Sequence, residues 1–290
     1  MADKQKVALV LSSGGARGFV HIGAIEALEE AGFEITSVAG TSMGALIGGM
    51  YAAGKLEEVK EWMTSLDRKQ ILSLVDFSLS LNHVVKGKRV MEALGKIVPD
   101  VDITTLRVPF CAVAADVQHG CEVDFRQGSL LNAVRASISI PSFFRPMHED
   151  GQVLIDGGVV NPIPMNRVQR TEGDITVAVN VNAPADPYYE TLRQQARVRL
   201  KAAGSVMWQR LLPEVTNVDS NYYTLLSKTF SLMIQQSSEC HLQMLPPDIC
   251  VNIPVNRFGG FDYDRAARIA RAGKSEMRRA IAAYRAREGR

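Results

Sequence analysis

The stretch KVALVLSSGGARGFVHIGAIEALEEAGFEITSVAGTSMGAL, residues 6–46, contains two consecutive units of strand, glycine turn and helix. In each unit an apolar run of strand length leads through a glycine-rich turn into a segment whose apolar residues have helical spacing. The spacing predicts strands at 6–11 and 35–39 and helices at 18–31 and 45–53. Two successive units of this kind predict a parallel sheet that is covered on both faces.

The rest of the chain continues this pattern and then departs from it. Apolar runs predict a helix at 130–137 and further strands at 108–115, 121–125, 153–155, 175–181 and 246–255. Residues 183–246 are helical in pattern, and we interpret them as an insertion or cap with the bulky residues Trp208, Leu211, Leu212, Tyr222 and Tyr223. The sequence thus predicts one α/β domain over residues 1–290, a three-layer α/β/α sandwich with a mostly parallel central sheet plus the helical insertion.

The composition is that of an ordinary globular protein. Of the 290 residues, 46% are hydrophobic and 22% are charged, and the formal net charge of +2 is too small to indicate a nucleic-acid partner. The four cysteines have no metal-binding spacing, which favours reduced thiols and names no metal site. The apolar run near the N-terminus is too short for a signal peptide, so we expect a cytoplasmic protein.

The pentapeptide GTSMG, Gly40 to Gly44, has the form G-x-S-x-G and follows a predicted strand. In a nucleophile elbow the serine sits on a sharp turn between strand and helix, and small residues two positions away on each side let the backbones pass closely. Ser42 is therefore the candidate nucleophile. The alternative is a tight turn in which Ser42 caps the following helix.

The hexapeptide SGGARG, Ser13 to Gly18, follows the first strand and opens the first helix. Glycines at a helix start let backbone N–H groups converge on one point, which favours an anion. The group bound there could be the oxyanion of acyl transfer or a phosphate, and the plain alternative is a helix-start turn. Arg17 could orient a substrate phosphate, but we expect it to hold the loop.

The hexapeptide VLIDGG, Val153 to Gly158, ends another apolar strand with Asp156, followed by Gly157 and Gly158. A carboxylate in this position can lie exposed in a cleft at the carboxyl edge of the sheet, although Asp-Gly-Gly is also ordinary turn chemistry. A serine nucleophile usually needs a histidine, and the chain has five. Only His241 follows the acid in the chain, and neither it nor His21, His83, His119 or His148 has catalytic surroundings.

The three motifs in their chain order GGARG, GTSMG and DGG, with the flanking segments ASISIPSFF (136–144) and NPIP (161–164), closely resemble the patatin-like phospholipase family over about residues 6–181. That resemblance implies a Ser-Asp dyad without histidine, in which Ser42 is the nucleophile and Asp156 is the base. It also implies an oxyanion hole lined by the amides of Gly14, Gly15, Ala16 and Arg17. The supporting glycines would be Gly18, Gly40, Gly44, Gly157 and Gly158.

We therefore expect a serine hydrolase of carboxylic esters that acts on lipids, of the phospholipase A or lysophospholipase type, through an acyl-enzyme. The chemistry is plausible for a dyad, because burial can raise the pKa of an aspartate and make it a better base. No metal or cofactor is demanded. The alternative is a catalytically silent regulatory protein that binds an acyl or phosphate ligand. The sequence names no oligomeric state.

The last segment, 262–290, predicts an amphipathic helix with nine Lys and Arg against four Asp and Glu. Its apolar stripe consists of Ala266, Ile269, Ala270, Met277, Ile281 and Tyr284. In the first interpretation the stripe packs on the core and the basic residues form a solvated face. In the second, the basic face makes peripheral contact with anionic lipid on the inner face of the membrane.

Overall fold

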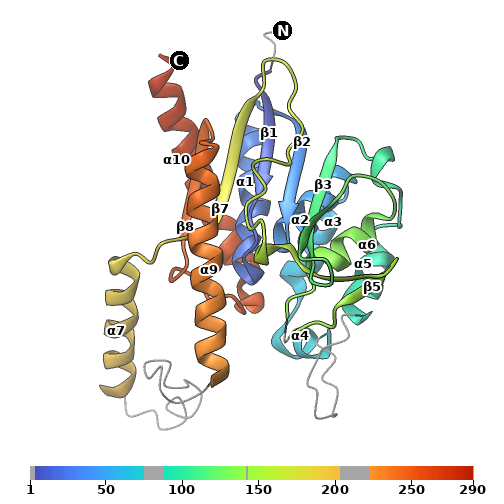
Figure 1. Ribbon diagram of the computed structural model, residues 1–290. Helices are drawn as coiled ribbons and strands as arrows, with labels where there is room; N and C mark the ends of the chain where they lie inside the picture. Colours follow the sequence, from blue (N-terminus) through green and yellow to red (C-terminus); the bar gives the residue numbers. More distant parts are fainter. Residues whose placement is uncertain (1–3, 75–87, 142, 203–221, 290) are drawn as a thin grey trace.

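The computed structural model of the protein describes residues 4–74, 88–141, 143–202 and 222–289. Its centre is a sheet of eight strands in the order β5-β6-β3-β2-β1-β7-β8, with β4 paired to β3 (Figure 1). The strands are β1 Lys6–Leu11, β2 Glu34–Thr41, β3 Phe110–Asp116, β4 Cys121–Phe125, β5 Met147–Glu149, β6 Gln152–Asp156, β7 Ile175–Ala183 and β8 Ile249–Pro254.

The strands β3, β2, β1, β7 and β8 run parallel to one another, as the repeated strand-helix units predict. The strands β4, β5 and β6 pair antiparallel at one side, which the sequence analysis did not foresee. Only a few residues join β3 to β4 and β5 to β6, and such short connections allow only antiparallel pairing. The predicted α/β fold is confirmed, with a mixed sheet whose larger part is parallel.

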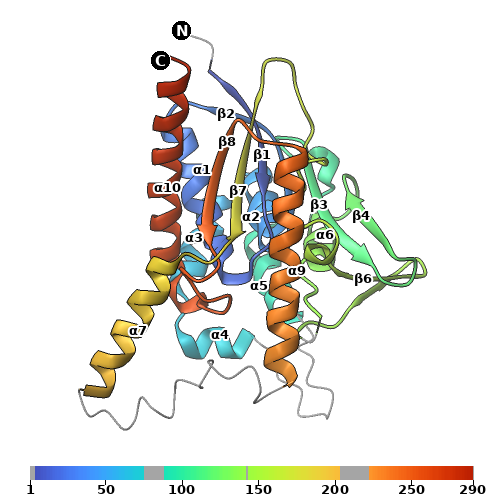
Figure 2. The same cartoon turned by 60° about the vertical axis from the view of Figure 1, so that its left-hand side comes forward.

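Helices cover both faces of this sheet, and Figure 2 shows α9 crossing one face with α1 and α2 behind the strands. The larger core lies between the strands and α1, α2, α6 and α10, and includes Leu9, Ile22, Ile47, Leu130 and Met277. The helices are α1 Val20–Glu30, α2 Met43–Ala52, α3 Leu56–Ser65, α4 Arg68–Leu74, α5 Lys88–Ile97, α6 Leu130–Ser137, α7 Pro187–Ala202, α9 Tyr222–Met244 and α10 Ala266–Arg287.

Helices α3, α4 and α5 occupy a part of the chain for which the sequence analysis made no prediction. Val59 and Met63 of α3 are buried, and Trp62 packs on the same core. Their spacing is helical, so the signal was present in the sequence. These helices matter for function because they line a cavity beside Ser42, described below.

The region 183–246, predicted to be an insertion or cap, contains α7 and α9. The C-terminal half of α9 belongs to the second core, where Ser238 is buried and Leu242 packs against the cluster that includes Val10 and Ile163. The N-terminal half is exposed at Leu226 and Phe230. The bulky residues named above lie outside the described part of the chain: Trp208, Leu211 and Leu212 entirely, Tyr222 and Tyr223 for their side chains.

Helix α10 packs along α1, and its predicted apolar stripe is buried, including Ile269, Met277 and Ile281. This is the first of the two interpretations given for the segment. Several of its basic residues are paired, since Lys274 contacts Glu26 and Glu30 and Arg278 also contacts Glu30 (residues of α1). Among the helices that the structure describes, none has both the length and the apolar character needed to span a bilayer.

Candidate active site

The predicted elbow is present at Ser42. Strand β2 ends at Thr41, α2 begins at Met43, and Ser42 between them has φ 57° and ψ −122°. Positive φ is strained for a residue with a side chain, and such strain is typical of functional turns. A Cβ at Gly40 would lie 2.3 Å from the carbonyl oxygen of Gly44, so the close approach that the motif predicts is real.

The hydroxyl of Ser42 donates a hydrogen bond of 2.5 Å to Oδ2 of Asp156, which lies 114 residues later in the chain. The side chains of Ser42 and Asp156 come together across β3. Thr41 pairs with Val113, and Ala114, the next residue of β3, pairs with Asp156 on its other side. Ser42 directly follows Thr41, so the register places it next to Ala114, the residue that Asp156 faces from the other side of β3.

Asp156 is buried rather than exposed, but it lines a cavity described below and lies beside Ser42, just past the carboxyl end of β2. Asp156 is the last residue of β6, which runs antiparallel to β3, and it pairs with Ala114 of β3. Only 3% of Ser42 and 7% of Asp156 is exposed. Burial raises the pKa of Asp156 to about 6, although the hydrogen bonds that it accepts from Ser42 and from the N–H of Gly158 oppose the shift.

The segment after α6 contacts both members of the pair. The Ser42 N–H donates to Oγ of Ser137 at 2.8 Å, and the Ser137 hydroxyl donates to the carbonyl of Val113 at 2.6 Å. The Asp156 N–H donates to the carbonyl of Ser139 at 3.0 Å. The sequence analysis quoted this segment only for its resemblance and assigned no role to Ser137. The residue is distant in sequence from Ser42, and no local motif joins them.

The glycine loop reaches the same site but is only partly free. The amides of Gly14 and Gly15 donate no hydrogen bond within the residues that the structure describes. The Ala16 N–H, in contrast, donates to the carbonyl of Gly260 at 2.9 Å, so it is already occupied. The sequence analysis expected four loop amides to face an oxyanion. This contact engages one of them, because a segment near the C-terminus packs on the loop.

Arg17 holds the loop, as expected. Its Nε donates to the carbonyl of Val181 at 3.0 Å and its Nη2 to Oδ1 of Asn182 at 3.1 Å, both at the end of β7. Burial lowers the pKa of Arg17 to about 10, so the guanidinium stays charged at neutral pH. Gly18 lies in the 3₁₀ turn Gly15–Phe19, and Gly157 and Gly158 begin the 3₁₀ turn Gly157–Val159.

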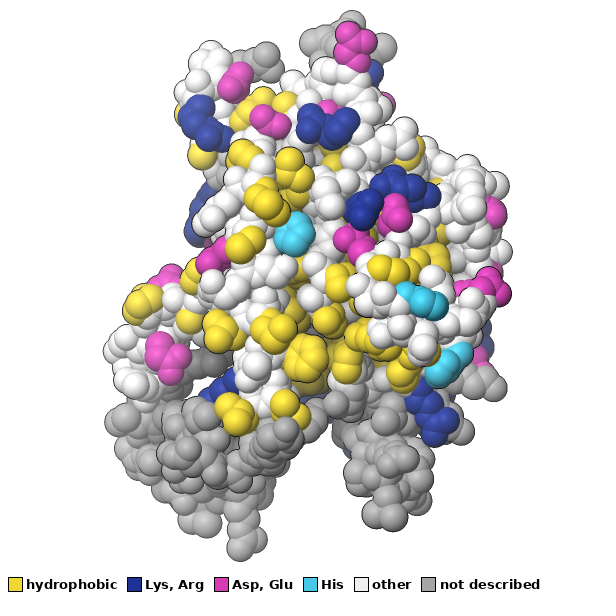
Figure 3. All heavy atoms as spheres, in the orientation of Figure 1, with side chains coloured by type: hydrophobic (Ala, Val, Ile, Leu, Met, Phe, Trp, Pro, Cys, Tyr) yellow, Lys and Arg dark blue, Asp and Glu magenta, His cyan; other side chains and the backbone are white. Residues whose placement is uncertain are grey.

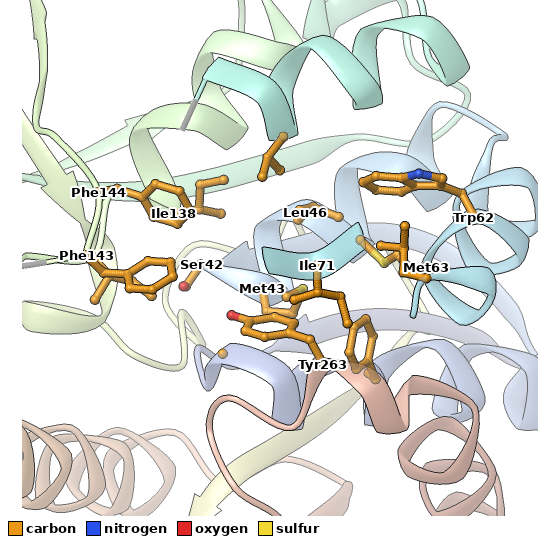
Figure 4. A pocket seen from close by; sticks show the side chains of 15 residues that line it. Ser42, Met43, Leu46, Trp62, Met63, Ile71, Ile138, Phe143, Phe144 and Tyr263 are labelled. Carbon is orange, nitrogen blue, oxygen red and sulfur yellow. The ribbon is translucent and has the colours of Figure 1, made fainter. Parts of the chain in front are cut away.

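Ser42 lies where two cavities meet. The first, of about 110 Å³, is apolar and runs from Ser42 to Trp62 and Met63 of α3 (Figure 4). The second, of about 230 Å³, has mixed character and includes Asp156 and Arg17. Its apolar lining includes Leu226, Phe230 and Ile234 of α9 and the neighbouring Phe261.

Exposed apolar residues surround the second cavity. Leu226 is 41% exposed, Phe230 is 39% exposed and Phe261 is 67% exposed, and all three line the cavity. On the face shown in Figure 3, hydrophobic side chains gather in the lower middle, over α9 and the loops beside it. The candidate site therefore lies beside an apolar surface.

The described histidines do not line either cavity. His21 is buried and its Nε2 contacts the carbonyl of Ser12, His119 pairs with Asp116, His148 is exposed on β5, and His241 bonds to Ser237 in its own helix. His83 lies outside the described residues. In the described ranges no three His, Cys, Asp or Glu side chains are grouped as metal ligands.

Comparison with known proteins identifies the family to which this chain is related. Residues 9–168, more than half of the chain, match the model of the family described as patatin-like phospholipase. An uncharacterized NTE family protein of Mycobacterium tuberculosis (strain H37Rv) is 45% identical over 181 residues, covering 62% of this chain and 50% of that protein. The aligned region thus spans about half the length of that relative.

Two animal proteins are more distant. Neuropathy target esterase sws of Drosophila melanogaster is 30% identical over 187 residues, covering 62% of this chain and 13% of that protein. Patatin-like phospholipase domain-containing protein 6 of Homo sapiens is 26% identical over 280 residues, covering 90% of this chain and 20% of that protein. With a family match over more than half of its length, the chain belongs to the patatin-like phospholipase family.

Proposed function

We propose that the protein hydrolyses carboxylic esters of lipids, with Ser42 as the nucleophile and Asp156 as its base. The observation that carries this proposal is the 2.5 Å hydrogen bond between the two side chains, made at a strained elbow beside two cavities. The raised pKa of Asp156 supports it, because a carboxylate with a pKa of about 6 accepts a proton more readily than an ordinary one.

The dyad can complete the reaction without a histidine. As Ser42 Oγ attacks the carbonyl carbon of the ester, its proton passes to Oδ2 of Asp156, and the carbonyl oxygen becomes an oxyanion. When the ester C–O bond breaks, Asp156 returns that proton to the leaving alcohol and the acyl group stays on Ser42. Asp156 then takes a proton from water, whose oxygen attacks the acyl carbon. As the bond from that carbon to Ser42 Oγ breaks, Asp156 returns the proton to Oγ and the acid is released.

The loop amides would stabilise the oxyanion. Gly14 and Gly15 have N–H groups without acceptors among the described residues, and they open the 3₁₀ turn that precedes α1. Gly15 has φ 56°, and a Cβ there would lie 2.6 Å from the carbonyl oxygen of Gly260, so the loop tolerates no side chain at this position. Preorganised donors of this kind are each worth about 3–4 kcal/mol in acyl transfer.

The two cavities suit the two halves of a lipid ester. The apolar cavity that ends at Trp62 would take the acyl chain, and the mixed cavity that contains Arg17 would take the alcohol side. The names of the animal relatives, an esterase and a phospholipase domain-containing protein, point in the same direction. We assign the protein to the phospholipase A or lysophospholipase type.

Location and domain organisation belong to the same proposal. The four cysteines are free thiols, which fits a reducing, cytoplasmic compartment. The chain would act as a single patatin-like domain, because α10 packs on α1 and the segment at Gly260 contacts the glycine loop. Peripheral contact with a membrane would bring the site to its substrate.

Labelling with a fluorophosphonate probe and hydrolysis of acyl esters and lysophospholipids test the proposal together. Ser42→Ala should abolish both, and Asp156→Asn should reduce hydrolysis by several orders of magnitude with the fold intact. The double variant should be no slower than the slower single variant, because the two side chains act as one unit.

The exposed residues Ser65 and Asp150 provide matched controls, so Ser65→Ala and Asp150→Asn should behave as wild type. If the wild-type protein takes no label and hydrolyses no ester, the silent ligand-binding alternative replaces this proposal. A loss as deep as that of Ser42→Ala in His148→Asn or His241→Asn would replace the dyad by a triad.

A further inference from the structure

The segment that follows β8 forms part of the candidate site, although it lies outside the family match at 9–168. Gly260 accepts the hydrogen bond from Ala16 described above. Next to it, the ring of Phe261 lies 5.7 Å from the ring of Phe143, which borders both cavities. This segment therefore packs on both the glycine loop and the cavity walls.

Tyr263 occupies the central position in this segment. It borders both cavities, as do Ser42 and Gly15, so it lies at the junction where the reacting ester would sit. Its ring packs edge-on against Phe19, with centroids 6.0 Å apart and an interplanar angle of 87°. Figure 4 shows its hydroxyl turned toward Ser42.

The hydroxyl of Tyr263 is available to a ligand. Within the described ranges the structure gives it no hydrogen-bond partner, although the Tyr263 N–H donates to the carbonyl of Phe261. Tyr263 is half-buried, and because it lines both cavities its hydroxyl can be reached by a molecule bound there. A substrate carbonyl at the junction would provide it with a partner.

The Tyr263 hydroxyl stays protonated, chiefly because the side chain is removed from water. Burial and the negative charge of Asp156 raise the pKa of Tyr263 to about 12, and the positive charge of Arg17 opposes that shift only in part. At neutral pH the side chain is therefore a neutral donor and not a base. It cannot compete with Asp156 for the Ser42 proton.

The oxyanion site has room for a further donor because Ala16 cannot serve. Its N–H is occupied by Gly260, and Arg17 lies inside the 3₁₀ turn, whereas the amides of Gly14 and Gly15 donate no hydrogen bond within the described residues. Tyr263 approaches the same junction from the segment that carries Gly260. The packing of this one segment on the glycine loop thus occupies the Ala16 N–H and also places the Tyr263 hydroxyl at the junction.

We propose that the Tyr263 hydroxyl donates a hydrogen bond to the carbonyl oxygen of the substrate ester as negative charge develops on it, together with the amides of Gly14 and Gly15. Tyr263 is then a catalytic residue of the proposed hydrolysis. The proposal rests on the function proposed above for Ser42 and Asp156. No covalent step changes, since the proton of Tyr263 stays on its oxygen throughout.

Tyr263→Phe tests the proposal, because it removes only the hydroxyl and keeps the ring that packs on Phe19. Tyr188→Phe is the matched control, since Tyr188 is 62% exposed on α7 and lines neither cavity. Loss of one oxyanion donor lowers kcat by roughly 10²- to 10³-fold in known cases, and we expect a fall of at least tenfold here with KM nearly unchanged. The control should keep the wild-type kcat.

A comparison of two esters then tests whether Tyr263 donates to the carbonyl oxygen or to the oxygen of the leaving alcohol. An alkyl ester and a p-nitrophenyl ester of the same acid should show the same deficit in Tyr263→Phe, provided that acylation limits both, because their carbonyl oxygens are alike. A deficit that disappears with the p-nitrophenyl ester would overturn the assignment to the oxyanion. So would a rise in KM with unchanged kcat, or full activity in the variant.

The outcome also separates the two proposals. If wild-type protein hydrolyses esters and Tyr263→Phe does so equally well, only the role of Tyr263 is wrong. If wild-type protein neither hydrolyses esters nor reacts with a fluorophosphonate, the function of Ser42 fails and the role of Tyr263 fails with it. The thermal unfolding midpoint of Tyr263→Phe should match that of wild type, which excludes a loss through misfolding.

Discussion

The carboxyl group of Asp156 is almost fully buried, and burial raises its pKa to about 6 although Ser42 and Gly158 both donate hydrogen bonds to it. A group with this pKa is mostly ionised at neutral pH and still basic enough to accept a proton from a serine. Once protonated, Asp156 can no longer accept the Ser42 proton. Its pKa should therefore be visible in the activity of the enzyme.

We expect kcat/KM to be constant above about pH 7 and to fall about tenfold per pH unit below the pKa of about 6. A pH profile on an uncharged ester, recorded between the acid and alkaline limits of stability, measures this. His148→Asn and His241→Asn should leave the acid limb in place. A limb centred near the ordinary aspartate pKa, or one that disappears with a histidine, would contradict the role of Asp156.

Single residues differ in how far the sequence could reveal them. Ser42, Asp156 and the glycine loop were predictable, because an elbow and an anion loop need particular residue types at short spacing. Their roles stay predictions until the variants above are measured. Ser137 and Tyr263 had no such signal, since their partners in the site lie far away in the chain. Only the packing of α6 and of the segment after β8 brings them there.

At the scale of secondary-structure elements, the elbow between β2 and α2 must be held in a strained conformation. Ser42 has φ 57°, and strain of this kind costs on the order of 1–3 kcal/mol. The bond from the Ser42 N–H to Ser137, which is itself bonded to Val113 of β3, fixes the turn from outside. The end of α6 thus supports the nucleophile.

Ser137→Ala should therefore lower kcat at least tenfold and reduce the free energy of unfolding by about 1–3 kcal/mol, the usual cost of a buried group that loses its partner. Ester kinetics and denaturant unfolding measure the two effects. Ser37→Ala is the control, because Ser37 is also buried and bonds to the carbonyl of Gln169, away from the elbow. It should lose stability but keep kcat. Unchanged kcat in Ser137→Ala would show that the elbow keeps its conformation without the hydrogen bond from Ser42 to Ser137.

The elements themselves were predictable to different degrees. The parallel strands were found because buried strands read as continuous apolar runs bounded by turns. The direction of β6 was not, because strand order is decided by tertiary contacts that no local pattern encodes. That direction places Asp156 opposite Ala114 and within hydrogen-bond distance of Ser42, while its role as the base stays a prediction.

At the scale of the whole molecule, charge and apolar surface are separated. Several basic residues of helix α10 form ion pairs with Glu26, Glu30 and Glu276, and its apolar stripe is buried. Three exposed apolar residues, Leu226 and Phe230 of α9 and Phe261, line the second cavity instead. A membrane that delivers substrate would therefore meet the protein at the cavity and not at α10.

We expect sedimentation with phosphatidylcholine vesicles that changes little with salt, because apolar contacts are not screened. Phe230→Ser combined with Phe261→Ser should reduce binding at least fivefold, an effect of about 1 kcal/mol on the scale of apolar burial. Val117→Ser is the control, since Val117 is 53% exposed in the turn after β3. Binding that requires anionic lipid and is lost in Arg278→Gln with Arg279→Gln would instead favour α10.

The contact between Ala16 and Gly260 joins the first glycine turn of the chain to a segment made more than two hundred residues later. During translation the N-terminal strands leave the ribosome first, and a contact with a residue far along the chain can form only after that residue has been synthesised. The serine elbow is therefore synthesised long before the segment after β8 that carries Tyr263. A half-made chain would carry the nucleophile without its complete site, so under the proposed function we expect ester hydrolysis to begin only once the segment around Gly260 has been made.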